Sequence, residues 1–491
     1  MKHSVWASAG LIALLTGCTI GPNYLRPSAP EPAAYKEPPP LAVKDAGPWK
    51  PAQPSDQGPR SKWWEVFGDP QLNALEEQVT ANNQSLKVAE AQLREARAAI
   101  GFNQAALLPT VSVAPSISSL HWSNNRPYFS HTHTTGDFIL PLDLSYEVDL
   151  WGRVGRTVTA AGEEAQATAA DLQTAGLSLH AELALDYFDL RSADSQKKLL
   201  DESVAAYRDA LQLTERRADG GLAPESDVAQ AKTLLDSTRV QATDISVQRA
   251  QSEHAIAVLI GKPPAGFDLP PEPLMLHQPA IPVGIPSDLL QRRPDIASAE
   301  RRMAAANEQI GIAKAAYYPS LSLGGSTGFE GEAITNWFNW PSLFWAVGAT
   351  MGETLFDGGR RKARSEEALA AYDATVANYR QTTLTAFQEV EDGLSALRIL
   401  EQEAAEQDEA VASAKNSLEL STNRYVGGKD TYLLVVTAQT VALANQRNQT
   451  EILRRRMQMS VLLIKALGGG WDSQELPKLV DLTNSSHEPK N

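Results

Sequence analysis

The sequence predicts a mostly α-helical chain that carries a few β-strands and is built from one unit repeated twice. Three observations predict this fold. Landmarks of the first half recur in the second half at fixed offsets, long stretches have helical patterns without breakers, and short stretches alternate apolar and polar residues. The 491 residues suffice for a stable core, and the net charge of −15 disfavours nucleic acid as a partner.

The internal repeat is the most informative of these features. Four heptad positions recur 210 residues later, Val79, Leu86, Leu93 and Ile100 becoming Leu289, Ile296, Met303 and Ile310. Three glycine landmarks recur 207 residues later, Gly152, the pair Gly220–Gly221 and Gly261 becoming Gly359, the pair Gly427–Gly428 and Gly468. The repeats are predicted to span 63–262 and 287–471, joined by a Pro-rich linker at 263–286. The change of offset places a three-residue length difference between Pro319 and Gly359.

Each copy is expected to run helix, strand, strand, long helix, Gly-Gly turn, helix. In the first copy, the seven-residue period over 71–107 indicates coiled-coil packing. Strict alternation over 140–150, with a less regular partner at 111–122, places strands within about 110–150, and the second copy places them within about 320–355. The helix over 153–218 would be roughly 100 Å long and the one over 224–260 roughly 55 Å.

The ends of the chain have their own signals. A basic residue and an apolar run over 1–17 indicate a secretory signal. The signal ends at Leu15-Thr16-Gly17-Cys18, which resembles the bacterial lipobox, so we expect cleavage before Cys18 and its lipidation; the alternative is a chance cysteine beside an ordinary cleavage site. Cys18 is the only cysteine, which excludes intramolecular disulfides and Cys-based zinc sites. Residues 18–62 are predicted to be a lipidated, Pro-rich, extended tether, and 472–491 a polar tail.

Four strands per chain have a consequence if they lie in a bilayer, although such alternation also occurs in soluble sheets. A bilayer tolerates no open sheet edge, and the smallest transmembrane barrels have eight strands. Two chains would give a barrel whose interior is filled by side chains. Three chains, with a twelve-stranded barrel and a twelve-helix tube, form the smallest arrangement that has a duct.

Several motifs together carry a family resemblance that covers nearly the whole chain. The motifs are Trp63-Trp64-Glu65-Val66-Phe67-Gly68-Asp69-Pro70-Gln71-Leu72, Pro286-Ser287-Asp288-Leu289-Leu290, Arg292-Arg293-Pro294-Asp295-Ile296, Ala315-Ala316-Tyr317-Tyr318-Pro319, Arg424-Tyr425-Val426-Gly427-Gly428-Lys429-Asp430-Thr431-Tyr432-Leu433 and Lys465-Ala466-Leu467-Gly468-Gly469-Gly470-Trp471. The chain resembles outer-membrane efflux lipoproteins of the TolC/OprM type, the NodT-type family of tripartite RND efflux systems. The resemblance implies a homotrimer with a β-barrel in the outer membrane and an α-barrel through the periplasm. It also implies passive export of small molecules after docking to a periplasmic adaptor and an inner-membrane transporter.

The candidate site residues lie at the two Gly-Gly turns. Gly220, Gly221, Gly427 and Gly428 suit the left-handed geometry of helix C-caps, and the resemblance adds adaptor contact for them and for Tyr425. Asp430 is interpreted either as a helix N-cap or, by resemblance, as part of an acidic ring that narrows the pore. The first copy has Ala223 at the corresponding position, so a trimer would carry three such carboxylates.

Two loop features keep two interpretations each. The pair His131 and His133 suits either a metal site or, preferably, a solvated loop. Aromatic residues that flank the strands suit either an interfacial girdle or packing at loop tips; they are Trp122, Tyr128, Phe129, Trp337, Phe338, Trp340, Phe344 and Trp345.

Two rival functions fit the sequence less well. An outer-membrane-anchored periplasmic adaptor would need one coiled-coil hairpin and soluble β domains. A lipid-anchored enzyme is disfavoured because HExxH, Walker A and GxGxxG patterns are absent from the sequence. We therefore expect no enzymatic activity, and no cofactor or metal beyond the N-acyl and S-diacylglycerol lipid on Cys18.

Overall fold

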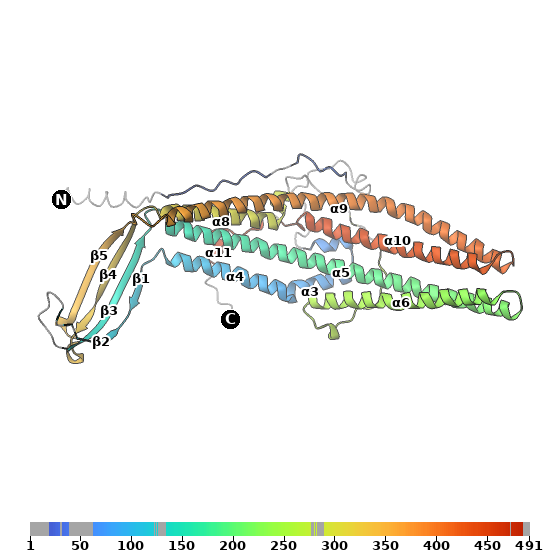
Figure 1. The fold of residues 1–491 in the computed structure, drawn as a ribbon, viewed down its shortest axis with the longest axis horizontal. Helices are drawn as coiled ribbons and strands as arrows, with labels where there is room; N and C mark the ends of the chain where they lie inside the picture. Colours follow the sequence, from blue (N-terminus) through green and yellow to red (C-terminus); the bar gives the residue numbers. More distant parts are fainter. Residues whose placement is uncertain are drawn as a thin grey trace.

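The computed structural model describes residues 19–29, 32–38, 62–121, 123, 125, 134–275, 279, 281, 289–471 and 473–484. The helices run side by side along the long axis, with a β-sheet at one end and two helix–turn–helix tips at the other (Figure 1). Within these residues, no helix is both long enough and apolar enough to cross a bilayer.

The repeated unit is visible in the bounds of the elements. The first copy contains α3 (Pro70–Asn82), α4 (Gln84–Ala105), β1 (Thr110–Val113), β2 (Ser116–His121), β3 (Thr134–Val148), α5 (Arg153–Asp219) and α6 (Glu225–Leu259). The second contains α7 (Leu289–Arg292), α8 (Pro294–Ala315), β4 (Ser320–Gly331), β5 (Leu343–Gly352), α9 (Arg360–Val426) and α10 (Tyr432–Ala466). The long helices α5 and α9 have 67 residues each, and α6 and α10 have 35 each. The predicted duplicated fold is confirmed.

The remaining elements are short. They are the 3-10 helices η1 (Trp63–Phe67), η2 (Pro264–Gly266), η4 (Ile334–Asn336), η5 (Trp340–Ser342) and η6 (Ser473–Glu475), and the helix α11 (Leu479–Asn484).

The prediction of one continuous helix over 71–107 is wrong, because the chain breaks at Asn83. Asn83 has extended backbone angles, and its side chain accepts from the Leu86 N–H at the start of α4. Its amide Nδ2 also donates to the Leu259 carbonyl at 2.8 Å, at the end of α6. Arg293, 210 residues later, makes the same kind of break, with Pro294 following it and Nη1 donating to the Ala466 carbonyl at 3.0 Å. At each break, a side chain therefore caps the C-terminal end of the last helix of its copy, which is α6 in the first copy and α10 in the second.

The strands form one antiparallel sheet whose strand order is β1/β2, β3, β4, β5. The expected first strand is interrupted: β1 and β2 both pair with β3, on either side of Ala114 and Pro115. Proline donates no backbone hydrogen bond, and it is tolerated at a sheet edge, which is where this interrupted strand lies. Strand β3 begins at Thr134, earlier than the alternation over 140–150 predicts. The sheet thus has four strand positions.

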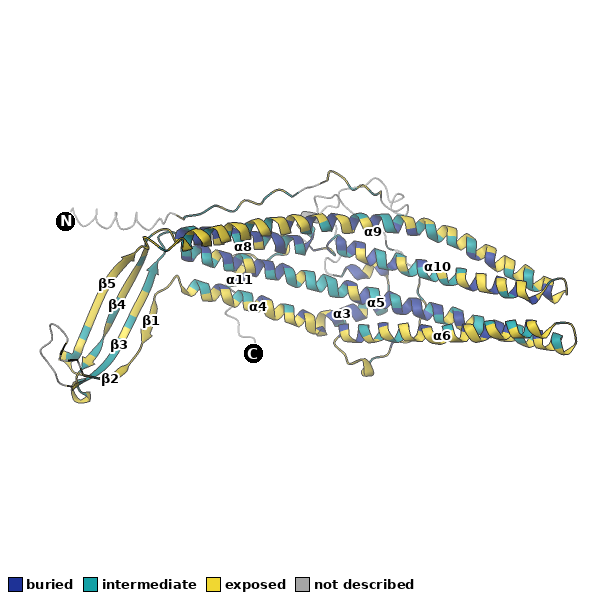
Figure 2. Cartoon of the chain, viewed as in Figure 1, coloured by how far each residue is buried: buried dark blue, intermediate teal, exposed yellow. Residues whose placement is uncertain are grey.

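The core lies in the helical part of the molecule, and the sheet is largely exposed (Figure 2). The opening motif joins this core: Trp63, Trp64 and Phe67 are buried in η1. Asp69 then caps α3, because its carboxylate accepts from the N–H groups of the first turn and, at 2.6 Å, from the Tyr187 hydroxyl of α5. The motif therefore fixes where the first copy starts against its long helix.

The described part of the N-terminal tether is extended, as expected, but it is docked along α8 and α9 (Figure 1). Tyr24 donates to Glu300 of α8 at 2.7 Å, and Arg26 donates to the Tyr379 hydroxyl of α9 at 2.8 Å. The backbone N–H of Lys36 donates to Glu391 at 2.7 Å. These contacts hold the segment as a strap on the helices.

Candidate functional site

The sheet has one apolar and one polar face. The register places directly opposite residues on the same face, and the alternation of β3 continues across most of the other strands, with Ser119 and Leu120 of β2 in reversed positions. The apolar face carries Val111, Val113, Ile117, Phe138, Leu140, Leu142, Leu144, Tyr146, Val148, Leu321, Leu323, Phe329, Leu343, Trp345, Val347, Ala349 and Met351. The polar face carries mainly serine, threonine, glycine and acidic residues, including Ser112, Asp143, Glu147, Ser322, Ser326 and Thr350. Such a sheet can separate an apolar medium from water.

Both edges of this sheet are open in the described chain. One edge is the outer side of β1 and β2, and the other is the outer side of β5. Apolar side chains on both edge strands are exposed, among them Ile117, Val347 and Met351. An exposed edge next to an apolar face is a template for pairing with another strand.

The loop aromatics divide between the two interpretations. Trp337 and Phe338 pack at the loop tip, with their ring centroids 4.6 Å apart and further ring contacts to Phe138 and Phe329. Trp340 and Trp345 are exposed, as a girdle would require. Trp122, Tyr128, Phe129, His131 and His133 lie outside the described residues. Among the described residues, no group of three His, Cys, Asp or Glu side chains could hold a metal ion.

The Gly-Gly turns lie at the tips of the hairpins α5–α6 and α9–α10, far from the sheet (Figure 1). Only the second glycine of each pair, Gly221 or Gly428, has a left-handed backbone, with φ of +69° in both. Gly220 and Gly427 have φ of −81° and −73°, so the expectation of left-handed geometry is wrong for them. The two turns have matching geometry, in agreement with the repeat.

Contact with an adaptor requires an accessible side chain, whereas Tyr425 is only 4% exposed in the single chain. Its ring packs edge-on against Tyr432 at 5.0 Å, and the guanidinium of Arg217 lies 4.9 Å from its centroid. Arg217 also donates to the Val426 carbonyl at 3.0 Å. Tyr425 therefore ties the two hairpins together within this chain and presents little surface to a partner.

Asp430 lies one residue before the N-cap of α10, which is Thr431, and the N-cap interpretation of Asp430 is wrong. Its carboxylate instead accepts from Nε and Nη2 of Arg424, the second contact at 3.2 Å. The guanidinium of Arg424 lowers the pKa of Asp430 below its usual value. The pair closes a salt bridge across the second turn, with the Asp430 side chain 18% exposed.

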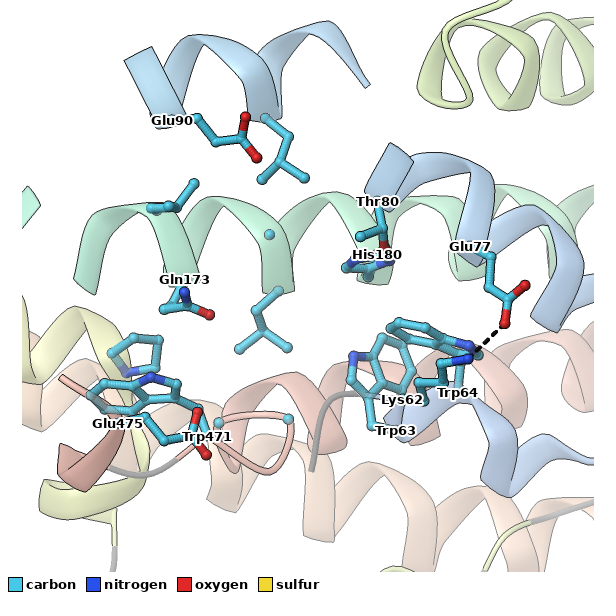
Figure 3. Close-up of a pocket in the computed structure, with 17 residues that line it drawn as sticks. Lys62, Trp63, Trp64, Glu77, Thr80, Glu90, Gln173, His180, Trp471 and Glu475 are labelled. Atoms are coloured by element: carbon cyan, nitrogen blue, oxygen red, sulfur yellow. Dashed lines mark hydrogen bonds and ion pairs between the residues drawn. The ribbon is translucent and has the colours of Figure 1, made fainter. Parts of the chain in front are cut away.

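A third feature lies midway along the helices, at the break between α3 and α4. A cavity of about 470 Å³ is lined by aromatic and acidic side chains, and Lys62 pairs with Glu77 at its rim at 2.6 Å (Figure 3). Trp64 stacks on His180 with centroids 4.4 Å apart. His180 Nδ1 lies 2.7 Å from Oε2 of Glu76, which is fully buried.

Burial shifts both members of this pair toward their neutral forms. It raises the pKa of Glu76 to about 9 and lowers the pKa of His180 to about 4. Although the two side chains are close enough for an ion pair, the desolvation cost favours a neutral carboxyl that donates to a neutral imidazole. Residue spacing alone could not reveal this pair, because 104 residues separate its members.

Comparisons with known proteins agree on one family. The profile of the family described as "Outer membrane efflux protein" matches residues 75–262 and 285–469, one match in each repeat. The toluene efflux pump outer membrane protein TtgF of Pseudomonas putida is 32% identical over 471 residues, which cover 95% of this chain and 97% of TtgF.

Solved structures show the same likeness. The outer-membrane channel OprN has a TM-score of 0.84 and 31% identity, covering 92% of this chain and 100% of that one. The CmeC outer membrane channel of Campylobacter jejuni has a TM-score of 0.86 and 26% identity, covering 96% and 98%.

Proposed function

The chain belongs to the outer membrane efflux protein family, and on this premise we propose that three copies of it close into a single export channel. The chain itself is the outer-membrane component of an efflux pump, with its sheet in the outer membrane and its helices extending into the periplasm. In the trimer, the three sheets would form one twelve-stranded barrel, and the helices would continue it as a tube.

One observation carries this proposal: the sheet is amphipathic and open at both edges. In a bilayer every backbone N–H and C=O must be paired, so each open edge needs another strand. Four strand positions are too few for a barrel, and three chains supply twelve. The apolar face would then meet lipid and the polar face would line the duct.

The partners and cargo are inferred from the family. We expect a periplasmic adaptor and an inner-membrane transporter to dock at the tips of the hairpins α5–α6 and α9–α10. TtgF is named for toluene efflux, which supports small, toxic, apolar compounds as the class of cargo. The channel would conduct them passively, and we assign it no catalytic role.

The tips support a closed aperture at the periplasmic end. Arg217 holds the Val426 carbonyl of the second hairpin, and Arg424 holds Asp430 within that hairpin. Three Asp430 carboxylates, one from each subunit, would then lie near the aperture. We propose that they favour cations and that these ties restrict passage until an adaptor docks.

The lipid on Cys18 is part of the proposal, although Cys18 itself lies outside the described residues. Thr19 packs against Gly152, the residue before α5, and the Ile20 N–H donates to the Trp151 carbonyl at 3.1 Å. Thr19, the first described residue, therefore lies near the junction of sheet and helices, which is the level at which acyl chains could enter the inner leaflet. We expect the barrel to anchor the trimer and the lipid to assist.

The rival adaptor function has less support. It requires a single coiled-coil hairpin with soluble β domains, whereas the described chain has two matched hairpins and a sheet with open, apolar edges. The matching family model and the similar solved structure OprN are also those of outer-membrane efflux proteins and channels, not of adaptors.

Membrane fractionation combined with unheated SDS gels tests the proposal. The expected result is an outer-membrane protein that runs as a trimer and conducts ions in planar bilayers. A soluble monomer would refute it. Cys18→Ser should still reach the outer membrane as a trimer, and loss of the trimer in that variant would contradict the auxiliary role of the lipid.

A further inference from the structure

The two β-hairpins of the chain have the same register. Thr110 lies opposite Ser145 in the first hairpin, and Ser320 lies opposite Gly352 in the second. Adding 210 to the first residue and 207 to the second converts one pair into the other. Each sheet half is therefore a copy of the other, and the three-residue length difference falls in the loop between β4 and β5.

This identity extends to the edges of the copies. Within the chain, the outer edge of the first hairpin, on β3, pairs with the outer edge of the second, on β4, and Asp143 lies opposite Ser326. The open edge of β5 is the counterpart of the paired edge of β3, and the open edge of β1 and β2 is the counterpart of that of β4. A closed ring of six equivalent hairpins would join these open edges in the same way.

From this relationship we infer that Thr350 of one subunit lies opposite Ser116 of the next copy of this chain. Adding 207 to Asp143 gives Thr350, and subtracting 210 from Ser326 gives Ser116. The inference rests on the proposed trimer and deepens it, because it fixes the register at which the copies join.

The faces of the strands provide an independent check. In the same register, Ala349 lies opposite Ile117 of the next copy, and both belong to the apolar face. Thr350 and Ser116 belong to the polar face. A slip by one residue would turn one edge strand's apolar side chains toward the duct. The register obtained from the repeat is thus also one that keeps each face uniform around the ring.

The same two offsets, 207 and 210, also predict which helical residues meet between subunits below the sheet. Several ion pairs join α5 to α8 within the chain, among them Arg301 with Glu163 at 2.8 Å and Arg302 with Asp171. Between subunits, their counterparts on α4 and α9 are Ala91 beside Ala370 and Gln92 beside Asn378.

All four of these counterpart residues are exposed in the single chain. The seam between α9 and the next copy's α4 therefore carries small or neutral side chains at these positions. These positions can become buried on assembly without removing charges from water.

Cysteine cross-linking tests the register, because the wild-type chain has only Cys18. Ser116→Cys combined with Thr350→Cys, purified from outer membranes and oxidised, should give covalent dimers and trimers on denaturing gels that a reductant reverses. Thr350→Cys combined with Ser112→Cys or Leu120→Cys should not, because each alternative is displaced by four residues, roughly 13 Å along the strand.

Two further samples separate the possible failures. Ser322→Cys with Thr350→Cys, which lie opposite each other within one chain, should form an intrachain disulfide and no covalent trimer. A native trimer in which only a displaced pair cross-links, or in which Ser116 and Thr350 stay unlinked while the intrachain control forms, would overturn the register. Monomeric protein throughout would instead refute the proposed trimer.

Discussion

Arg156 of α5 donates to Glu308 of α8 at 2.6 Å, in a salt bridge whose side chains are 8% and 12% exposed. The contact joins the two copies within one chain. At the corresponding join between subunits, the repeat places Ala363 beside Ala98. The charged pair within the chain thus has a neutral counterpart between subunits, which suits surfaces that are exposed to water before assembly.

Loss of one partner of this bridge should be costly. Glu308→Ala leaves the Arg156 charge buried, so we expect a loss of about 3–5 kcal/mol in the free energy of unfolding. Arg156→Met combined with Glu308→Leu should recover most of it. The measurement is denaturant unfolding in detergent, with Arg364→Ala as control, because Arg364 and its partner Glu367 are exposed. Equal losses in the free energy of unfolding for Glu308→Ala and Arg364→Ala would contradict a stabilising role of the buried salt bridge between Arg156 and Glu308.

The break at Asn83 should also contribute to stability. Asn83→Ala removes the cap of α4 and the donor to the Leu259 carbonyl, so we expect a loss of about 1–2 kcal/mol. Asn82→Ala, at the neighbouring exposed position, is the matched control and should change unfolding little. If both variants unfold alike, the two contacts of Asn83 have no energetic role.

These contacts mark the limit of what residue patterns predict here. Glycines, prolines and heptads recur at fixed offsets, and alternation in β3 is strict, so the duplicated unit, the long helices and the two-faced sheet could be predicted. The break at Asn83 could not, since the heptad positions Val79 and Leu86 continue across it and the reason for the break is a distant carbonyl. Likewise, Tyr425 resembles a surface residue of a turn until the second hairpin packs beside the first.

The two glycines of the first turn should differ in their tolerance of a side chain. Gly221 has φ of +69°, so Gly221→Ala should cost about 1 kcal/mol in backbone strain. Gly220 has φ of −81°, and an added Cβ would make only ordinary contact, so Gly220→Ala should be neutral or stabilising. Hydrogen exchange of the tip reads this out, as faster exchange in Gly221→Ala alone. Equal exchange in the two variants would contradict the turn assignment.

The buried pair of Glu76 and His180 should make stability depend on pH. Burial raises the pKa of Glu76 to about 9 from an ordinary 4.5, so between these values the folded chain keeps a proton that the unfolded chain has lost. Stability therefore falls as pH rises through this window. Burial lowers the pKa of His180 to about 4 from 6.5, which opposes the trend only below pH 6.5.

The clearest range is therefore pH 6.5 to 9, where Glu76 acts alone. Glu76→Gln keeps a neutral donor for His180, so its free energy of unfolding should lose this slope, which is at most about 1.4 kcal/mol per pH unit. Glu77→Gln, at the exposed neighbour that pairs with Lys62, should keep the wild-type slope. Parallel pH profiles of wild type and Glu76→Gln would show that Glu76 is ionised in the folded protein.

Two variants test the two proposed roles of Asp430 at the aperture, which are its salt bridge and its negative charge. Asp430→Ala and Arg424→Ala each remove the salt bridge across the second turn, so both should raise single-channel conductance in planar bilayers. Their effects on selectivity should differ in sign: losing the carboxylate weakens cation preference, and losing the guanidinium strengthens it.

Low pH should change conductance and selectivity in the same direction as Asp430→Ala. The pKa of Asp430 lies below its ordinary 3.8, so the salt bridge persists at neutral pH and is lost as pH falls through that lowered value. Asp219→Ala removes an exposed acid from the other tip, and should leave conductance at the wild-type value because the described ties between the hairpins are made by Arg217 and Tyr425. If Asp430→Ala has wild-type conductance and selectivity, Asp430 neither restricts nor selects, and the aperture must be sought elsewhere on the tips.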